Sequence, residues 1–272
     1  KKFADQDSND EAAQGMDVDN QQEGEDNSQD GSGDEMDEDS DDDEANVARS
    51  AVPATNRASQ QSVVHKLTGH KGMVLGCDFH PMGRHLGTAG HDGTWRLWDV
   101  EHGQELLLQD GHAKDLSAIA FHPDGSLAMT ADAGGVALLW DIRSGQMIQA
   151  FQGHIKKISS VSFSANGFHA ATSSLDNTVK IWDLRRRRVG YTLPAHTNIV
   201  SEVRYSPSGE QLLTCSFDNT IKLWSARDFH ILRTLAGHSG KVMSADFAPD
   251  EKHIVSAGFD RTVKLWAHKD EF

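Results

Sequence analysis

The 272-residue sequence contains only two cysteines, and it has no apolar run long enough to cross a membrane. Cys77 and Cys215 stand alone in different parts of the chain, which argues against a disulfide framework or a paired metal motif. A membrane-spanning helix needs about 20 consecutive apolar residues, so neither a membrane span nor a signal segment is expected. These absences favour an intracellular, reducing location.

Positive charge is nearly absent from the first 44 residues, which contain 19 acidic residues and two lysines. The rest of the chain is almost neutral, so the acidic balance describes one segment and no general basic surface for nucleic acid is indicated. Because residues 1–44 have few large apolar side chains, we expect them to be disordered, with a linker at 45–61. This acidic segment is either a solvating insertion or a competitor of RNA for basic partner surfaces.

An internal repeat of 42 residues organises the chain from residue 62 to residue 272. Gly-His or Ala-His pairs recur at this step, and a tryptophan follows each histidine after 28 residues. The repeats cover about 69–110, 111–152, 153–194, 195–236 and 237–272. Each contains four short β-rich runs separated by turn residues, which is the pattern of one blade of a β-propeller. We therefore predict an all-β fold with five blades.

The ends of the repeat array suggest how a ring could close. The fifth repeat stops after its third strand, whereas residues 62–68 (SVVHKLT) form an additional predicted strand before the first repeat. If that strand completes the last blade, the exposed sheet edges are covered and the ring closes with five blades.

The recurring positions resemble the WD-repeat family, in which a histidine, a serine or threonine, an aspartate and a tryptophan of each blade form a hydrogen-bonded set. The resemblance implies these sets in the first, third, fourth and fifth repeats: His70, Thr88, Asp92, Trp98; His154, Thr172, Asp176, Trp182; His196, Thr214, Asp218, Trp224; His238, Ser256, Asp260, Trp266. The second repeat has His112, Thr130 and Trp140, but Gly134 stands where the aspartate is expected. That blade should be the least rigid unless Asp132 takes over the role.

A histidine, a hydroxyl and an aspartate together also suggest a hydrolase. Five copies at a constant step argue for a structural role instead, because a catalytic site is needed only once. The other histidines follow no metal-ligand spacing, so we expect no catalytic residue, metal, cofactor or small-molecule substrate.

A more specific resemblance runs from Gly90 to Trp266, in segments such as DGTWRLWDVEHGQELLLQDGH and DNTVKIWDLRRRRVGYTLPAH. These segments resemble the WD-repeat proteins of the spliceosomal U4/U6 small nuclear ribonucleoprotein (snRNP), in the variable loops as well as in the shared positions. The resemblance implies a nuclear scaffold in pre-mRNA splicing that binds other proteins of the U4/U6 snRNP and of the U4/U6·U5 tri-snRNP. It implies that U4 and U6 RNA are contacted indirectly.

Two departures from that family concern blade number and the N-terminal region. The family has seven blades and an N-terminal partner-binding region, whereas five repeats and an acidic run are present here. We expect Lys1 to lie in an insertion within an upstream blade, with two repeats outside this sequence. The chain then forms part of a seven-bladed ring rather than a closed ring of five.

Propellers bind partners mainly through their loops, because the strands are occupied with one another. The third residue after each loop histidine varies freely, as Met73, Asp115, Lys157, Ile199 and Lys241. The residue before the turn aspartate is Leu175, Phe217 or Phe259 in the last three repeats. We predict that Met73, Lys157, Ile199, Lys241, Phe217 and Phe259 contact a partner; they could equally be solvated or packed between blades.

Four consecutive arginines, Arg185, Arg186, Arg187 and Arg188, lie at the turn between the third and fourth strands of the third repeat. They could contact RNA phosphate or an acidic protein segment, or they could simply face water. Lysine or arginine in the third strands, as at Lys180 and Lys222, is expected to be structural.

The fold by itself suits a second function equally well, namely substrate recognition or an adaptor role in a ubiquitin ligase or a signalling complex. The agreement in variable loops favours splicing, and co-purification of U4 and U6 RNA would separate the two.

Overall fold

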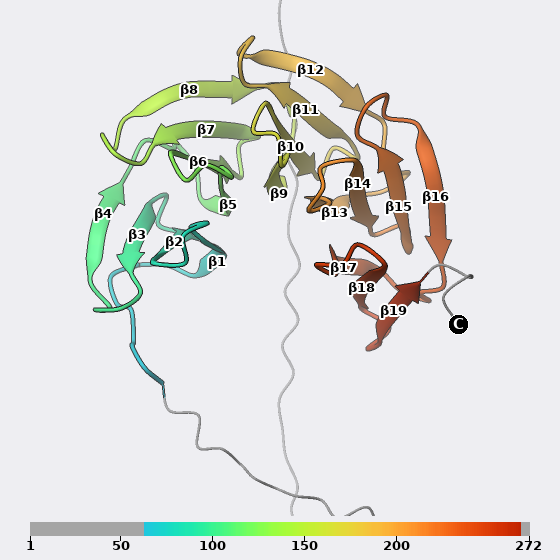
Figure 1. Cartoon of the computed structure of the whole chain (residues 1–272), viewed down its shortest axis with the longest axis horizontal. Helices are drawn as coiled ribbons and strands as arrows, with labels where there is room; N and C mark the ends of the chain where they lie inside the picture. Colours follow the sequence, from blue (N-terminus) through green and yellow to red (C-terminus); the bar gives the residue numbers. More distant parts are fainter. Residues whose placement is uncertain (1–62, 268–272) are drawn as a thin grey trace, which may run out of the picture. The chain divides into compact units, whose positions relative to one another are not determined.

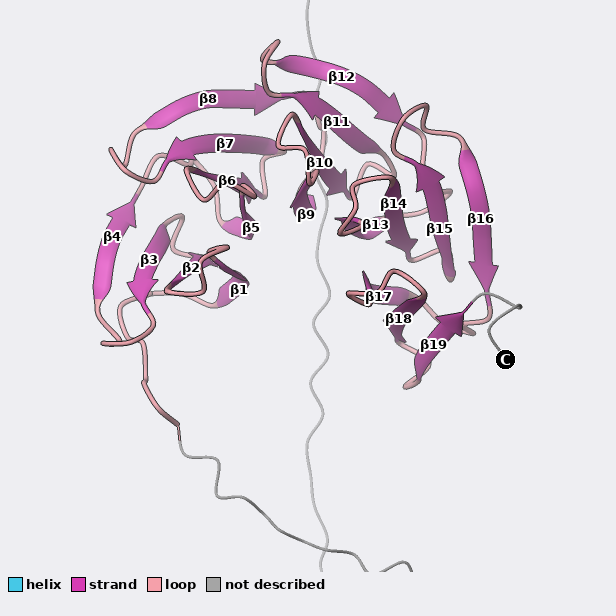
Figure 2. Ribbon diagram, viewed as in Figure 1, coloured by secondary structure: helices cyan, strands magenta, loops and turns pink. Residues whose placement is uncertain are grey.

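The computed structural model describes residues 63–267, and the predicted acidic segment and linker at 1–61 lie outside the described residues. Within 63–267 there are 19 strands in five antiparallel sheets (Figures 1 and 2). The all-β fold with five repeats is thereby confirmed.

The first sheet contains β1 (Val74–Phe79), β2 (His85–Gly90), β3 (Trp95–Asp99) and β4 (Glu105–Gln109). The second contains β5 (Leu116–Phe121), β6 (Leu127–Asp132), β7 (Val136–Asp141) and β8 (Met147–Gln152). The third contains β9 (Ile158–Phe163), β10 (His169–Ser174), β11 (Val179–Asp183) and β12 (Arg188–Leu193). The fourth contains β13 (Val200–Tyr205), β14 (Gln211–Ser216), β15 (Thr220–Ser225) and β16 (Ile231–Ala236). The fifth contains β17 (Val242–Phe247), β18 (His253–Gly258) and β19 (Val263–Ala267).

Each sheet is a meander, in which consecutive strands are hydrogen-bonded neighbours joined by short turns. The turns use residues that tolerate a positive φ, for example Gly125 (φ 77°) between β5 and β6 and Asn177 (φ 69°) between β10 and β11. The first strand of every sheet lies toward the centre of the array, and the fourth lies at its outside (Figure 1).

The hydrophobic core lies between neighbouring sheets. Phe151 on β8 packs against Trp182 on β11 with ring centroids 5.2 Å apart, so the outer strand of the second sheet covers the third sheet. Strand β5 is buried along its whole length, because it has a sheet on either side. Burial of this kind is the main stabilising contribution in a propeller, since no sheet can cover both of its own faces.

Serine hydroxyls connect the inner strands of neighbouring sheets at intervals of one repeat. Ser117 donates to the carbonyl of Ile158 at 2.5 Å, and Ser159 donates to the carbonyl of Val200 at 2.6 Å. Ser201 continues the series with Val242 at 2.6 Å. These bonds connect each inner strand directly to the first strand of the next sheet.

The fifth sheet, and strand β1 of the first sheet, are less buried than the equivalent strands of the sheets between them. On β19 the side chains of Val263 and Leu265 are 73% and 70% exposed, whereas Val179 and Ile181 at the equivalent positions of β11 are buried. Strand β1 alternates between exposed and half-buried residues. In Figure 1, β1 and β17 stand apart at the two ends of an arc of sheets.

The prediction that residues 62–68 complete the fifth sheet is wrong for the part that is described. Residues 63–72 contain no strand, and the fifth sheet has three strands. Hydrogen bonding from His65 Nε2 to the carbonyl of Glu101 at 2.8 Å instead holds this segment beside the turn that follows β3. The described residues therefore form five successive sheets without closing into a ring.

No helix within residues 63–267 is long and apolar enough to cross a membrane.

Candidate functional site

A chain of buried polar side chains crosses each sheet near the loop edge. In the third sheet the indole Nε1 of Trp182 donates to Thr172 Oγ1 at 2.9 Å. Thr172 Oγ1 lies 2.8 Å from Nε2 of His154, whose Nδ1 lies 2.8 Å from Asp176 Oδ2. Because the indole can only donate and the carboxylate can only accept, the hydroxyl donates to Nε2 and the proton of the imidazole is on Nδ1. Every polar atom of the set thus has a partner.

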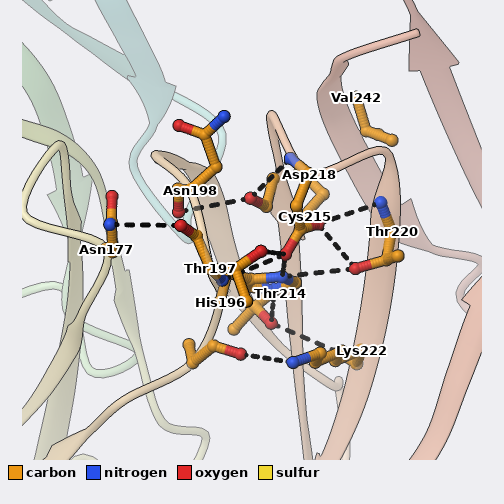
Figure 3. A network of polar contacts seen from close by, with 12 residues as sticks. Asn177, His196, Thr197, Asn198, Thr214, Cys215, Asp218, Thr220, Lys222 and Val242 are labelled. Atoms are coloured by element: carbon orange, nitrogen blue, oxygen red, sulfur yellow. Dashed lines mark hydrogen bonds and ion pairs between the residues drawn. The ribbon is translucent and has the colours of Figure 1, made fainter.

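The same arrangement occurs in all five sheets, with narrow variation in distance. The imidazole Nδ1 lies 2.8–3.0 Å from its aspartate, Nε2 lies 2.7–2.8 Å from its hydroxyl, and the indole lies 2.7–2.9 Å from that hydroxyl. The sets are His70–Thr88–Asp92–Trp98, His112–Thr130–Asp132–Trp140, His154–Thr172–Asp176–Trp182, His196–Thr214–Asp218–Trp224 and His238–Ser256–Asp260–Trp266. Figure 3 shows His196, Thr214 and Asp218 of the fourth set, with Thr220 and Lys222 beside them.

The second sheet reaches the same result with a different aspartate. Asp132 lies at the end of β6, two residues before Gly134, and its Oδ2 accepts from His112 Nδ1 at 3.0 Å. Its Oδ1 accepts from the backbone N–H groups of Gly134 and Val136, at 2.8 and 2.9 Å. In the first sheet a side chain at the corresponding Gly90 would come within 2.6 Å of His70 Nδ1. The aspartate of a sheet can therefore be at the position of Asp132 or at that of Gly134, because a side chain at either position reaches the same imidazole.

Burial controls the ionisation of these sets. It lowers the pKa of His112, His154 and His196 below 6.5, and this effect exceeds the opposite effect of the neighbouring aspartates. Burial also tends to raise the pKa of Asp218, but hydrogen bonds from Thr220 and the proximity of His196 outweigh it and lower the pKa to about 2. His112, His154 and His196 are therefore neutral at neutral pH, and the Asp218 carboxylate is ionised.

These shifts predict that acid destabilises the protein below about pH 6.5. Below that value the unfolded chain protonates His112, His154 and His196, whereas the folded chain does not until the pH reaches their lowered pKa. Each such histidine reduces the free energy of unfolding by up to about 1.4 kcal/mol per pH unit across that window. Protonation of Asp218 adds a further loss below about pH 4. Urea unfolding midpoints at pH 7.5, 6.5 and 5.5 would measure this; equal midpoints at all three would contradict the assignment.

The sets have the hydrogen-bond order of a hydroxyl–imidazole–carboxylate triad, but their hydroxyl groups are not accessible. Each hydroxyl is enclosed between an indole and an imidazole, and Thr130, Thr172 and Thr214 are fully buried. A substrate could not reach these oxygens without unfolding the blade. Among the described residues no group of three or more His, Cys, Asp or Glu side chains is placed to hold a metal ion.

The loop residues predicted to bind a partner are brought together in pairs along one edge of the sheets. In every sheet the N–H of the residue before the turn donates to the carbonyl of the third residue after the loop histidine. The pairs are His91–Met73, Ala133–Asp115, Leu175–Lys157, Phe217–Ile199 and Phe259–Lys241, at 2.8–3.0 Å. We call the edge formed by these ten residues the loop rim. Met73, Lys241 and Phe259 are exposed there, while Lys157, Ile199 and Phe217 are half-buried.

The fourth and fifth sheets contribute a cation between two aromatic rings. Lys241 Nζ lies 4.8 Å from the centroid of the Phe217 ring and 5.8 Å from that of the Phe259 ring. Phe259 is 65% exposed, so its ring is available to a partner, whereas Phe217 is half-buried. The two phenylalanines are thus neither fully solvated nor fully enclosed.

Arg185, Arg186 and Arg187 lie at the opposite edge of the third sheet, in the turn from β11 to β12, and Arg188 begins β12. All four are exposed. The third-strand cations differ from them: Lys222 Nζ donates to the carbonyl of Ala195 at 2.7 Å, Lys180 Nζ to Thr192 at 3.0 Å, and buried Arg96 pairs with Glu105. These contacts stabilise the third strand against its neighbours.

Two groups of residues that connect neighbouring sheets in the structure were not identified from the sequence. The inner serines Ser117, Ser159 and Ser201 recur at the repeat step, and that spacing was a signal that could have identified them. Tyr191 and Phe229 stack with centroids 4.9 Å apart and an interplanar angle of 15°, which no local pattern indicates.

The comparisons with known proteins agree with this architecture. The WD domain, G-beta repeat family matches residues 61–99, 103–141, 145–183, 187–225 and 229–267. The last four matched segments begin with the outer strand of one sheet and end with the third strand of the next, so repeat and sheet are offset by one strand.

Two curated relatives match short segments. The chain is 51% identical over 45 residues to the U4/U6 small nuclear ribonucleoprotein PRP4 of Saccharomyces cerevisiae, which is 16% of this chain and 10% of that protein. It is 39% identical over 54 residues to the probable cytosolic iron-sulfur protein assembly protein Ciao1 of Aedes aegypti, covering 18% of this chain and 16% of that protein. Since the five family matches cover well over half of the chain, it belongs to the WD40 repeat family, whose members are generally non-catalytic scaffolds.

Proposed function

We propose that this chain is a non-catalytic scaffold of the U4/U6 snRNP and of the U4/U6·U5 tri-snRNP, acting in the nucleus during pre-mRNA splicing. The match to PRP4 supports the choice of particle. The polar sets support a structural rather than a catalytic use of their histidines, because each hydroxyl is enclosed between an indole and an imidazole. No cofactor or small-molecule substrate is part of the proposal.

The observation that carries the binding role is the aromatic and cationic cluster of the loop rim. Phe259 is an exposed large aromatic side chain, Lys241 lies beside it, and Phe217 supports Lys241 from the neighbouring sheet. Preformed aromatic anchors of this kind dominate the energetics of protein interfaces. We infer that the direct partners at this rim are snRNP proteins, and that U4 and U6 RNA reach the rim through them.

The test is affinity purification of the tagged full chain from nuclear extract, followed by quantification of U4 and U6 RNA and of the accompanying proteins. Replacing Phe217 and Phe259 by alanine should weaken partner binding by about 2–4 kcal/mol, because the anchor is removed. At least a tenfold loss of both RNAs and their proteins is therefore expected.

A control variant removes exposed apolar area from the opposite edge of the sheets. Met82, 76% exposed in the turn between β1 and β2, serves this purpose as Met82→Ala. The proposal fails if wild-type chain recovers neither U4 nor U6 RNA. If wild type and the double alanine variant recover equal amounts of both RNAs and their proteins, the binding surface is not the loop rim.

The alternative proposal is an adaptor or substrate-recognition subunit of a ubiquitin ligase or signalling complex. The fold suits that role equally. The match to a probable iron-sulfur assembly protein shows that a short segment of the chain is also similar to a WD-repeat protein of another assembly. Recovery of ligase or signalling subunits without U4 and U6 RNA would select this alternative.

A further inference from the structure

We propose that the edge of the sheets opposite the loop rim binds single-stranded RNA directly, through the arginine turn Arg185–Arg188 and the aromatic side chains beside it. This contact goes beyond the scaffold role and does not depend on it, because it is measured with the purified chain alone. It also goes beyond the expectation that RNA is reached only through proteins.

The arginine turn is held in place by its own backbone. Asp183, whose side chain is largely buried, accepts hydrogen bonds from the backbone N–H groups of Arg185 and Arg186 at 3.0 and 2.9 Å. Its carboxylate lies 4.0 and 3.7 Å from the two side-chain Nε atoms, which is too far for close pairing. The aspartate thus shapes the turn and leaves the guanidinium groups largely available to an external anion.

The guanidinium groups of this turn have little competition from other carboxylates. Within the described residues, Arg187 and Arg188 make no side-chain ion pair or hydrogen bond, and both are exposed. The equivalent turns of the neighbouring sheets carry Arg143 near Asp141 and Arg227 beside Asp228, so the net positive charge of these three turns is concentrated on the arginine turn. The nearby Glu210 lies 3.7 Å from Arg227. Asp228 is engaged by His230 at 2.7 Å.

Aromatic rings lie next to these cations. The guanidinium of Arg185 lies over the Phe168 ring, 4.3 Å from its centroid, and Phe168 itself is exposed. On β12, Tyr191 is 43% exposed and stacks against Phe229, which belongs to the turn that carries Arg227. Guanidinium planes and exposed rings both stack on nucleobases. This combination favours RNA over an acidic protein segment, which would need the cations but not the rings.

Fluorescence anisotropy with a labelled 15-nucleotide oligouridylate and the full chain tests the proposal. If three guanidinium groups neutralise phosphates, the slope of log K against log salt is about −2, and affinity falls about 20-fold between 50 and 200 mM KCl. Replacing Arg186, Arg187 and Arg188 together by glutamine should remove most of this slope and weaken binding at least tenfold at 50 mM. Tyr191→Ala should weaken binding several-fold while leaving the salt slope unchanged, because it removes stacking and no charge.

The matched control removes the same number of positive charges at the edge of the loop rim. Replacing the rim residues Lys157 and Lys241 and the adjacent Lys156 by glutamine should leave RNA affinity within twofold of wild type. An equal loss in this control, or unchanged binding in the arginine variant, overturns the proposal. A synthetic peptide of residues 17–44 tests whether an acidic protein segment binds here instead of RNA. If the chain binds this peptide at the arginine turn and does not bind RNA, the turn is an acidic-protein site and the RNA proposal is overturned.

Discussion

Trp182→Ala is expected to reduce the free energy of unfolding by about 3–5 kcal/mol, the range for removing a large aromatic side chain from a core. Trp182 is 1% exposed and packs against Phe151 of the preceding sheet. Its indole also supplies the donor to Thr172. The substitution therefore leaves a cavity between two sheets and weakens the polar set that holds the loop. Urea or thermal unfolding of the purified variant measures the loss.

Trp266→Ala is the natural control, because it removes the same side chain from the fifth sheet. Trp266 donates to Ser256 at 2.8 Å as the other tryptophans do, but it is only half-buried. Its sheet has three strands, so less packing is lost, and we expect a reduction of about 1–2 kcal/mol. A loss below about 1 kcal/mol for Trp182→Ala would show that its indole is not a core element.

Asp132→Ala should destabilise the second sheet by about 3–5 kcal/mol, more than is usual for replacing an aspartate. The carboxylate is 3% exposed and accepts from His112, Gly134 and Val136. Without it, the buried imidazole N–H of His112 and the backbone N–H groups of Gly134 and Val136 lose their acceptor. Unfolding midpoints of wild type and variant give the difference directly.

Gly134→Asp in the Asp132→Ala background should restore half or more of the lost stability. Residue 134 is where the other four sheets carry their aspartate, and Gly134 has no positive φ that would oppose a side chain. A carboxylate there can accept from His112, as Asp176 does from His154. In wild type, Gly134→Asp alone should destabilise, because two carboxylates then meet at one imidazole. If the double variant is no more stable than Asp132→Ala, the aspartate positions are not interchangeable.

The polar sets could be predicted from sequence because their members are close in the chain. In the third sheet, for example, Thr172 is 18 residues after His154 and Trp182 is 10 residues after Thr172. A four-stranded meander with tight turns converts that spacing into one geometry. The acceptor in the second sheet was harder to assign, because spacing indicated position 134 and only the direction of the Asp132 side chain decides that it reaches His112.

For the loop rim and the arginine turn, the sequence predicted which residues lie in loops but not which side chains come together on the surface. Sequence spacing placed Phe217, Phe259 and Lys241 in loops, and packing between sheets decided that the lysine lies between the two rings. The Arg185–Arg188 run was visible at once, whereas the Tyr191–Phe229 stack beside it joins two sheets and has no local signature. Contacts between blades depend on the rotation of one sheet relative to the next.

The sequence by itself determined the blade: its length, its four-strand order, the polar set and the turn chemistry all follow from interactions within one repeat. Only the tertiary structure decided what joins blade to blade and where the array ends. Residues 63–72 have the composition of a strand, yet a strand forms only where a partner edge is within reach, and in the described residues the fifth sheet does not offer its edge to them. Hydrogen bonding within a repeat is encoded locally, whereas closure is a long-range property of all the blades together.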